Sequence, residues 1–441
     1  LMLFHSNLYL TTFLPIVFFL YFFKYKKFYF PKIVTLSIAS VIFYSAWNIY
    51  FLPLIIFIII FNYYFSKLII NNKNYLTLVI ATNLLILIIF KYTDFLIVNF
   101  NLIFDKNISL LNLPFPLALS FVTFQVIAFL IDYYERGIKK IEFKNFFLFI
   151  IFFPQLIAGP IVKYNYMVSQ YKNNKNKRIN INNIFAGLIL ILIGFIKKTV
   201  LADNLGFFAD LGFNNPAEIS LIESWITSFA FTFQIYFDFS GYVDMATGSA
   251  LLFNIKLPQN FNSPFKAISL VNFWQRWHMT LTSFLTNYIF NPGVRSLKKV
   301  TFSKMMFLIL LVFIICGFWH GPSWMYGFFG LLHGLGLAIN HIYNKYSKIK
   351  LNYIISWILT FGFVNFTFIF FRSQDFSEGL IIIKKMFDFK SLSFEASQII
   401  PLDKSIILLI VCLIISIIYK NSYEFFYKYL KTNQNINRLF F

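Results

Sequence analysis

The sequence predicts an all-α protein that crosses a membrane many times, and three features carry that prediction. Hydrophobic residues make up 59% of the 441 positions, and charged residues only 12%, about half their share in a typical soluble domain. Long apolar runs recur along the whole length. The formal net charge is +21. A soluble protein could not hide so much apolar surface, so a soluble enzyme, a disordered chain and a disulfide scaffold are excluded.

The apolar runs set the number of expected membrane helices. A helical crossing needs about 20 apolar residues, and on that measure we expect roughly ten to twelve crossings, some of them short. The clearest runs are Leu8–Phe23, Pro53–Phe65, Leu76–Phe90, Met305–Phe318, Leu351–Phe371 and Ile406–Tyr419. We interpret the first run as a retained membrane helix, because no small-residue cleavage site follows it.

Basic loops predict the orientation in a cytoplasmic (inner) membrane. Lysine and arginine in short loops favour the cytoplasmic side, which explains the positive charge better than a nucleic-acid partner does. No long basic helix or RNA-binding signature accompanies it. Lys24, Lys26, Lys27 and Lys32 place the first loop in the cytoplasm, so the N-terminus is expected outside. Glu135–Lys144, with Lys139 and Lys140, is expected to be cytoplasmic as well.

The segment Phe146–Val162 does not fit a simple crossing. It contains the run FFPQLIAGP, and the basic loop Lys163–Arg178 follows it. Both flanks therefore favour the cytoplasm. A broken re-entrant hairpin satisfies this, provided that protein covers the freed backbone groups. The alternative is a short, kinked crossing with a basic loop on the unfavoured side.

The later segments are expected as follows. We expect a short span at Ile184–Val200, a polar outer segment at Leu201–Ala217, and two apolar stretches at Glu223–Phe237 and Gly241–Phe253. The helix Met305–Trp319 is expected to pair with a second helix, Trp324–Asn340. Near the end of the chain we expect an amphipathic interfacial segment at Asp375–Lys390 and a basic tail at Lys420–Phe441, whose role is left open. We expect one transmembrane domain over 1–441, made of N-terminal helices (1–135), a core with re-entrant segments (136–345) and C-terminal helices with the tail (346–441).

Polar residues gather in two places near apolar helices. Ionisable groups at membrane depth are costly and therefore mark functional sites by default. One cluster is CGFWHGPSW, Cys316–Trp324. The other lies in Gln234–Asn291 and comprises Asp238, Ser240, Asp244, Gln275, Arg276, His278, Thr280, Thr282 and Asn287.

His320 is the strongest candidate for a catalytic group. It follows a long apolar run, and Gly321-Pro322 breaks the helix directly after it. A neutral imidazole there could take a proton from an incoming hydroxyl. His278 is the second candidate, and His333 suits a structural role as well as a catalytic one. A purely structural pair of histidines stays open, as does a Ser-His-Asp triad without the usual nucleophile motif. A zinc site would need further ligands, and no metal is expected.

The motifs FFPQLIAGPIVKY, FIKKTVLADNLG, QIYFDFSGYVDMATG, NFWQRWHMTLTSFL, FWHGPSW and FFRSQDFSEGL occur in this order along the chain. In this order they resemble the membrane-bound O-acyltransferase family, within the branch of alginate and peptidoglycan O-acetylation membrane subunits and the teichoic-acid D-alanylation protein. The opening LPIVFFLYFF and SVIFYSAWN resemble the first helices of that branch.

The resemblance implies roles for individual residues. His320 would be the catalytic histidine, beside Trp319, and His278 the second histidine of the same site. Trp274, Arg276 and Trp277 would support the segment, and Asp238, Ser240, Tyr242 and Asp244 would shape the funnel wall. The branch often has Arg-Asp-Tyr where this chain has Thr286-Asn287-Tyr288. An acid orienting His278 is thus missing there, and Asn287 is expected to replace it by a neutral hydrogen bond.

The resemblance further implies transfer of an acetyl group across the membrane. The donor would be acetyl-CoA or an acyl carrier in the cytoplasm, not a permanently bound cofactor. The acceptor would be a cell-envelope polysaccharide, peptidoglycan or else an alginate-like exopolysaccharide. A secreted, esterase-like partner would complete the transfer, and membrane lipids would surround the chain. A transporter or flippase without bond chemistry is the main alternative, and a structural scaffold is a third.

Overall fold

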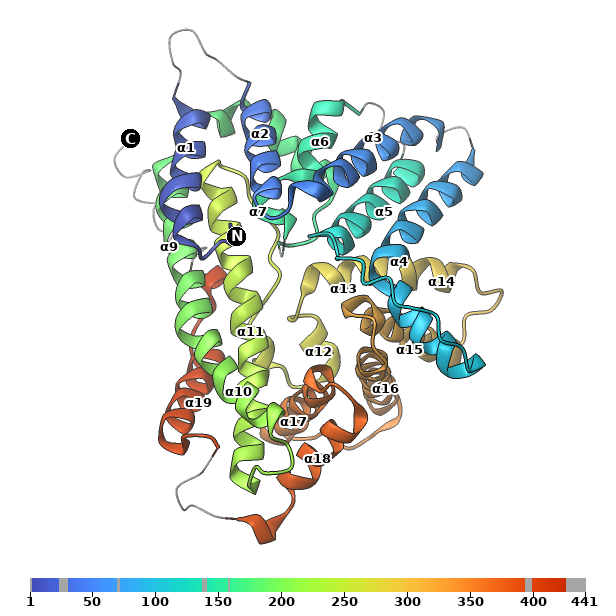
Figure 1. Cartoon of the computed structure of the whole chain (residues 1–441), viewed down its shortest axis with the longest axis vertical. Coiled ribbons are helices and arrows are strands. Elements are labelled where there is room, and N and C mark those ends of the chain that lie inside the picture. The colour runs from blue at the N-terminus through green and yellow to red at the C-terminus, as the bar shows by residue number, and fades with distance from the viewer. Residues whose placement is uncertain are drawn as a thin grey trace. The chain divides into compact units, whose positions relative to one another are not determined.

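The structure, a computed structural model, describes residues 2–23, 31–69, 72–136, 141–157, 159–392 and 399–425. Every regular element within these ranges is a helix, as the sequence predicts (Figure 1). The chain forms two compact units, which are described separately here. The predicted single domain over 1–441 therefore stays a prediction. Lys24, Lys26, Lys27, Lys139, Lys140 and residues 426–441 of the tail lie outside the described ranges.

The first unit covers the described parts of 2–192 and 242–258. Its helical elements are η1 (Leu8–Phe13), α1 (Leu14–Phe22), α2 (Lys32–Ser45), η2 (Ile49–Phe51), α3 (Leu52–Ile69), α4 (Lys73–Phe104), α5 (Leu119–Arg136), α6 (Phe143–Ile151), α7 (Phe153–Leu156), α8 (Tyr164–Lys172) and η3 (Asn174–Lys177). Asn62 of α3 and Asn83 of α4 exchange two buried amide hydrogen bonds of 3.0 and 2.8 Å. Within a membrane, apolar burial does little to select which helices pack together, so hydrogen bonds of this kind help to join a particular pair.

The second unit covers 193–241 and the described residues from 259 onward. Its helical elements are η4 (Lys197–Ala202), α10 (Asp203–Asn214), η5 (Pro264–Lys266), α12 (Leu270–Trp274), α13 (Met279–Leu285), η6 (Thr286–Phe290), α14 (Asn291–Arg295), α15 (Phe302–His320), α16 (Trp324–Tyr346), α17 (Tyr353–Arg372), α18 (Phe376–Met386), η7 (Phe389–Ser391) and α19 (Leu402–Ile417). α9 (Ile181–Ile196) and α11 (Leu221–Leu252) contribute residues to both units.

Five helical segments of the described chain are long and apolar enough to cross a membrane. They are Ile49–Ile69, Lys73–Phe104, Ile181–Asn214, Phe302–His320 and Tyr353–Arg372, and two shorter apolar segments are Leu8–Phe22 and Lys32–Ser45. This number is below the expected ten to twelve because several long helices carry polar residues. The 32-residue α11, for example, includes Glu223, Asp238 and Asp244. Burial of such groups inside a bundle is typical of functional membrane helices.

Two expected boundaries are wrong. The predicted outer loop Leu201–Ala217 is mostly helix, since α9, the π-helical η4 and α10 run on continuously to Asn214. The two predicted helices Glu223–Phe237 and Gly241–Phe253 are the single helix α11. Lys198 forms ion pairs in both segments: its ammonium lies 3.0 Å from the Asp203 carboxylate and 2.7 Å from that of Asp238.

The broken hairpin predicted between Phe146 and Val162 has its two ends together. Glu142 precedes α6 and Lys172 ends α8, and their side chains form an ion pair of 2.8 Å. This bond first, and then the one with Lys144, lower the pKa of Glu142, so its carboxylate is ionised. The residues that flank the predicted hairpin, Glu142 and Lys172, therefore lie next to each other, as expected for a hairpin. Its membrane side stays a prediction.

The protein itself satisfies the polar backbone freed at the break. The amide of Gln155 donates to the Phe149 carbonyl at 2.7 Å, and the Ser40 hydroxyl of α2 accepts from the Phe153 N–H at 3.0 Å. Gly159 lies so close to Gln155 that a Cβ would come within 2.3 Å of its Cα, which explains the glycine. These contacts meet the condition for irregular backbone at membrane depth.

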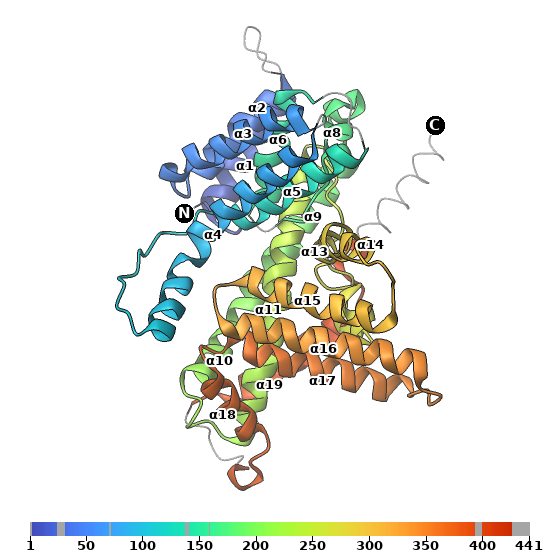
Figure 2. The same cartoon turned by 90° about the vertical axis from the view of Figure 1, so that its right-hand side faces the viewer.

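α15 and α16 form a helical hairpin that presents His320 at its turn. The two helices pack along their length and lie side by side in both views (Figures 1 and 2). A Cβ on Gly317 would lie 2.1 Å from the Tyr326 carbonyl oxygen and 3.0 Å from the Gly330 Cα. The backbones therefore approach more closely than any side chain would permit, as at small-residue contacts of membrane helices.

Candidate active site

His320 is the last residue of α15, at the tip of the helical hairpin. Gly321 is fully extended (φ −172°, ψ 163°), so the helix ends at the residue that the Gly-Pro pair predicts. The His320 ring is half-buried among aromatic rings, with centroids 5.0 Å from Trp319 and 5.2 Å from Phe371. This is a mostly apolar setting that a substrate could still reach through the exposed part of the ring.

His278 lies beside the same tryptophan. The Trp319 ring centroid is 6.2 Å from that of His278 and 5.0 Å from that of His320. The His278 side chain is buried, with 1% exposure, and the Phe239 ring meets it edge-on at 4.8 Å. The two histidines that sequence reasoning selected are therefore brought together around one indole, although 41 positions separate them in the chain.

Asn260 fixes which nitrogen of His278 carries the proton. Its Oδ1 accepts from the Thr280 backbone N–H at 3.2 Å and from the Thr280 hydroxyl at 2.8 Å. The backbone donor identifies this atom as the amide oxygen. His278 Nδ1 lies 3.1 Å from the same oxygen, and two acceptors cannot share a hydrogen bond. Nδ1 therefore carries the hydrogen, and in the neutral ring Nε2 holds the lone pair.

The Nε2 atom of His278 is buried and has no hydrogen-bond partner among the described residues. An unsatisfied acceptor inside a protein is costly, so its persistence favours a role toward a substrate hydroxyl or N–H. The backbone supports this reading: His278 has φ 42° and ψ 52°, a left-handed conformation that is uncommon for residues other than glycine. Such strain gathers at functional sites.

Trp274 supports the site through His333. Its indole N–H donates to His333 Nδ1 at 3.2 Å, and His333 Nε2 lies 2.9 Å from the Thr367 hydroxyl of α17. Since Nδ1 accepts, Nε2 carries the hydrogen in the neutral ring and donates to Thr367. His333 is fully buried and hydrogen-bonded at both nitrogens, so it has the structural role that the sequence left open.

The neighbours of His278 in sequence, Arg276 and Trp277, hold the surrounding loop through contacts with other residues. The Arg276 guanidinium donates to the Asn272 side chain and to the Asn262 carbonyl, both at 3.1 Å. Trp277 is buried and stacks on Phe273, with ring centroids 5.6 Å apart. Both side chains therefore help to fix the loop around His278, and their supporting role in the reaction stays a prediction.

The predicted funnel residues divide between the two units. Asp238 belongs to the second unit and pairs with Lys198. Ser240 is buried in that unit, and its hydroxyl has no hydrogen-bond partner among the described residues. Tyr242 and Asp244 belong to the first unit, where the Tyr242 hydroxyl lies 3.3 Å from His5 Nδ1. Their shared wall with His278 thus stays a prediction.

Asn287 does not orient His278, contrary to the expectation from the sequence. It lies in η6, and its amide donates to the Ser283 carbonyl at 2.7 Å and to the Ser283 hydroxyl at 3.1 Å. The orienting group is Asn260, from the loop before α12. Sequence reasoning missed it because Asn260 precedes His278 by 18 positions across a turn that no helical spacing describes.

A cavity of about 400 Å³ adjoins the His278 segment within the second unit. Trp274 and Thr282 form part of its wall, and the Thr282 hydroxyl donates to the Trp274 carbonyl at 3.1 Å. Apolar side chains such as Ile309 line much of the rest, with His341 and Phe302 farther along the chain. The volume lies within the range of small-molecule sites.

No group of three or more His, Cys, Asp or Glu side chains that could hold a metal occurs in the described ranges. Cys316 and Cys412 are both buried and reduced. The polar groups around the two histidines are instead amides, hydroxyls and indoles, which orient hydrogen bonds.

Replacing Asn260 with alanine is expected to lower kcat about 10- to 100-fold, a range typical when the partner that orients a functional imidazole is lost. His278 would lose its fixed tautomer, and the His278 ring would be free to turn. Asn260→Asp keeps the acceptor oxygen and should recover much of the rate while shifting the pH–rate profile. Steady-state rates of the purified chain test this. An Asp variant as slow as the Ala variant, with an unchanged profile, would contradict the positioning role.

The fold and site together define a class of protein: an all-α, multi-pass membrane protein with two histidines at a largely apolar centre. Comparisons with known proteins agree. The family model of the membrane-bound O-acyltransferases (MBOAT) matches residues 134–377, more than half of the chain and including both histidines. The chain belongs to this family and is an O-acyltransferase.

The chain is also similar to individual named proteins. A peptidoglycan O-acetyltransferase of Helicobacter pylori is 39% identical over 441 residues, covering 90% of this chain and 83% of that protein. A probable alginate O-acetylase of Pseudomonas aeruginosa is 31% identical over 404 residues, covering 88% of this chain and 75% of that protein. A teichoic acid D-alanyltransferase of Bacillus subtilis is 26% identical and covers 60% of this chain and 70% of its own length.

Proposed function

We propose that the chain takes an acetyl group from a cytoplasmic donor and passes it across the inner membrane to a hydroxyl of peptidoglycan outside. The observation that carries the mechanism is the pair of imidazoles next to Trp319, one of them with its tautomer fixed. The choice of peptidoglycan rests on the similarity of 39%, against 31% for the alginate relative. An alginate-like polysaccharide is the second candidate.

The proposed reaction is transfer of an acetyl group from a thioester to an alcohol. His320 accepts the proton of the incoming hydroxyl as its oxygen attacks the thioester carbonyl carbon. The carbon–sulfur bond breaks, an ester forms, and the proton passes from His320 to the leaving thiolate. His278 Nε2 accepts a hydrogen bond from a second hydroxyl or an N–H of the acceptor as the reacting oxygen attacks, which aligns that oxygen. The surrounding aromatic rings exclude water that would hydrolyse the donor.

Acetyl-CoA is the proposed donor, or else an acylated carrier protein. The cavity beside Trp274 and Thr282 would hold the slender arm that carries the acetyl group. The basic segment Arg295–Lys304 adjoins that cavity through Phe302, and its positive charge would attract the donor phosphates. We further propose an extracytoplasmic N-terminus and a secreted, esterase-like partner, as the basic loops and the family resemblance imply.

The proposal is tested with the full chain in proteoliposomes loaded with radiolabelled acetyl-CoA. We expect label to leave the donor and, in cells that also express the partner, to appear as alkali-labile acetyl esters on peptidoglycan fragments. Parallel cells that produce alginate test the second acceptor. No consumption of acetyl-CoA, with transfer from an acylated carrier protein, would overturn the donor. Esters on alginate alone would overturn the acceptor.

A further inference from the structure

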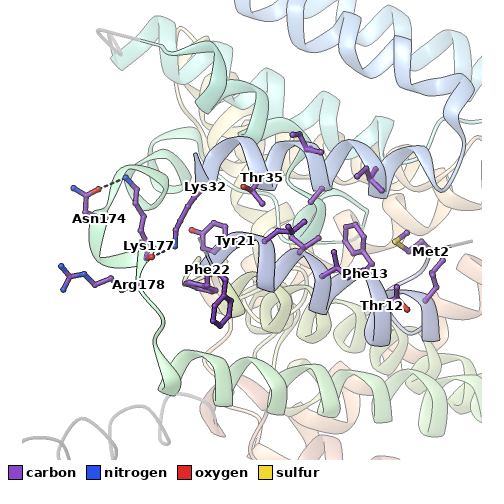
Figure 3. Close-up of a pocket in the computed structure, with 18 residues that line it drawn as sticks. Met2, Thr12, Phe13, Tyr21, Phe22, Lys32, Thr35, Asn174, Lys177 and Arg178 are labelled. Carbon is purple, nitrogen blue, oxygen red and sulfur yellow. Dashed lines mark hydrogen bonds between the residues drawn. The ribbon is translucent and has the colours of Figure 1, made fainter. Parts of the chain in front are cut away.

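A concave groove of about 720 Å³ lies between α1 and α2 in the first unit (Figure 3). Its lining is apolar over most of its length. Val17 and Ala39 are buried there, whereas Leu20 and Ile38 expose 65% and 46% of their surface. No aspartate or glutamate is among its described lining residues. The groove is too apolar for a sugar or nucleotide and has the volume of a ligand site.

One end of the groove is strongly basic. Lys32, Lys177 and Arg178 lie there with Asn174, next to Tyr21 and Phe22 of α1 (Figure 3). The Lys32 ammonium donates to the Lys177 carbonyl and lies 4.5 Å from the ring centres of both Tyr21 and Phe22. The Lys177 ammonium donates to the Asn174 side chain at 2.7 Å.

A buried asparagine holds the basic loop in place. The Asn254 amide donates to the carbonyls of Asn176 at 3.0 Å and Arg178 at 2.7 Å, and its oxygen accepts from Asn183 at 2.8 Å. Asn254 itself is only 4% exposed and has φ 59°. The backbone that carries Lys177 and Arg178 is therefore fixed by two hydrogen bonds from one side chain, and Asn183 of α9 holds that side chain in turn, so the charged end is a built feature.

We propose that this groove binds one anionic phospholipid, with its phosphate at the basic end and an acyl chain between α1 and α2. The charge and the apolar length together select this occupant. The helical run Leu8–Phe22 extends about 22 Å at 1.5 Å per residue, more than half of the roughly 30 Å hydrocarbon core. A soluble phosphate would leave the apolar groove open to water, and a zwitterionic lipid brings no net negative charge to the cations.

This inference is separate from the proposed acyl transfer. The groove gives Lys177 and Arg178 a ligand other than the acetyl donor. The lipid would seat α1 against α2 and hold the basic loop at the membrane surface. Lipid binding can therefore be measured whether or not the chain transfers an acetyl group.

The test is native mass spectrometry of the full chain in detergent with phosphatidylglycerol or phosphatidylcholine. We expect one tightly retained phosphatidylglycerol and weaker retention of phosphatidylcholine. In the variant Lys177→Ala/Arg178→Ala, affinity for phosphatidylglycerol should fall about 30-fold, since each cation near an anionic headgroup is worth a factor of about five. The matched control is Lys348→Ala/Lys350→Ala, which removes two exposed charges of the second unit and should leave the affinity unchanged.

A second pair of variants tests the acyl chain. Thr35 lines the groove (Figure 3), so Thr35→Trp should fill it and abolish retention of phosphatidylglycerol, while Thr35→Ser should bind normally. Equal weakening by the Lys348/Lys350 control would mean nonspecific surface attraction and would overturn the proposal. So would unchanged binding in Thr35→Trp. Displacement of the lipid by inorganic phosphate or coenzyme A would show a soluble-anion site instead.

Discussion

Replacement of His320 by alanine is expected to reduce acetyl transfer to background, a loss of about 10²- to 10⁴-fold, the usual contribution of a general base. His320 lies at the tip of the α15–α16 hairpin, half-buried against Trp319 and Phe371. His333 could not take its place, because it is fully buried with both nitrogens hydrogen-bonded. Transfer of radiolabelled acetyl in proteoliposomes measures the effect.

The matched control for His320 lies on the same helix. Phe307 is 59% exposed on α15, and Phe307→Ala should leave the rate close to that of the unaltered chain. Size-exclusion profiles and thermal unfolding establish that each variant is folded and inserted. A folded His320→Ala protein with near-normal transfer would refute the assignment of His320 and, with it, the proposed mechanism.

Replacement of His278 by alanine is expected to lower kcat about 100-fold with a smaller change in KM for the donor. The lone pair on Nε2 is held in place by Asn260 and has no partner among the described residues, so its contribution arises when the hydroxyl reacts. An interaction realised mainly in the transition state affects kcat more than KM.

A second substitution separates chemistry from backbone strain at His278. The residue has φ 42°, and asparagine tolerates this region better than alanine. His278→Asn should therefore fold as well as the unaltered chain and still lose activity. Ser283→Ala, an exposed change on α13, serves as the control. A merely twofold loss in both His278 variants would leave His278 with a structural role.

The sequence was sufficient for features that local chemistry decides. The apolar run before His320 and the Gly-Pro pair after it predict both α15 and the position of its end, and the structure confirms them. The two flanks of Phe146–Val162 predict a broken hairpin, and the Glu142–Lys172 ion pair brings its ends together. In each case the signal lies within about one helix length of the feature.

The remainder depends on contacts between distant segments. The sequence predicts that one apolar segment ends at Phe237 and the next begins at Gly241, but Lys198 pairs with Asp238 and α11 runs through all of these positions. Asn260 reaches His278 across a loop, with no periodicity to reveal it. A single sequence records neither of these pairings, because both partners are common residue types and only the folded chain brings them into contact.

The meeting of Glu142 with Lys172 also bears on how the chain is threaded through the bilayer. A segment that begins and ends on the same side of the bilayer crosses it an even number of times or not at all. Every helix after it therefore keeps the orientation that it would have without the hairpin. Reporters fused just before Glu142 and just after Lys172 should consequently report one and the same compartment. The helices before residue 142 then set the membrane orientation of the catalytic half, however deeply the hairpin enters the bilayer.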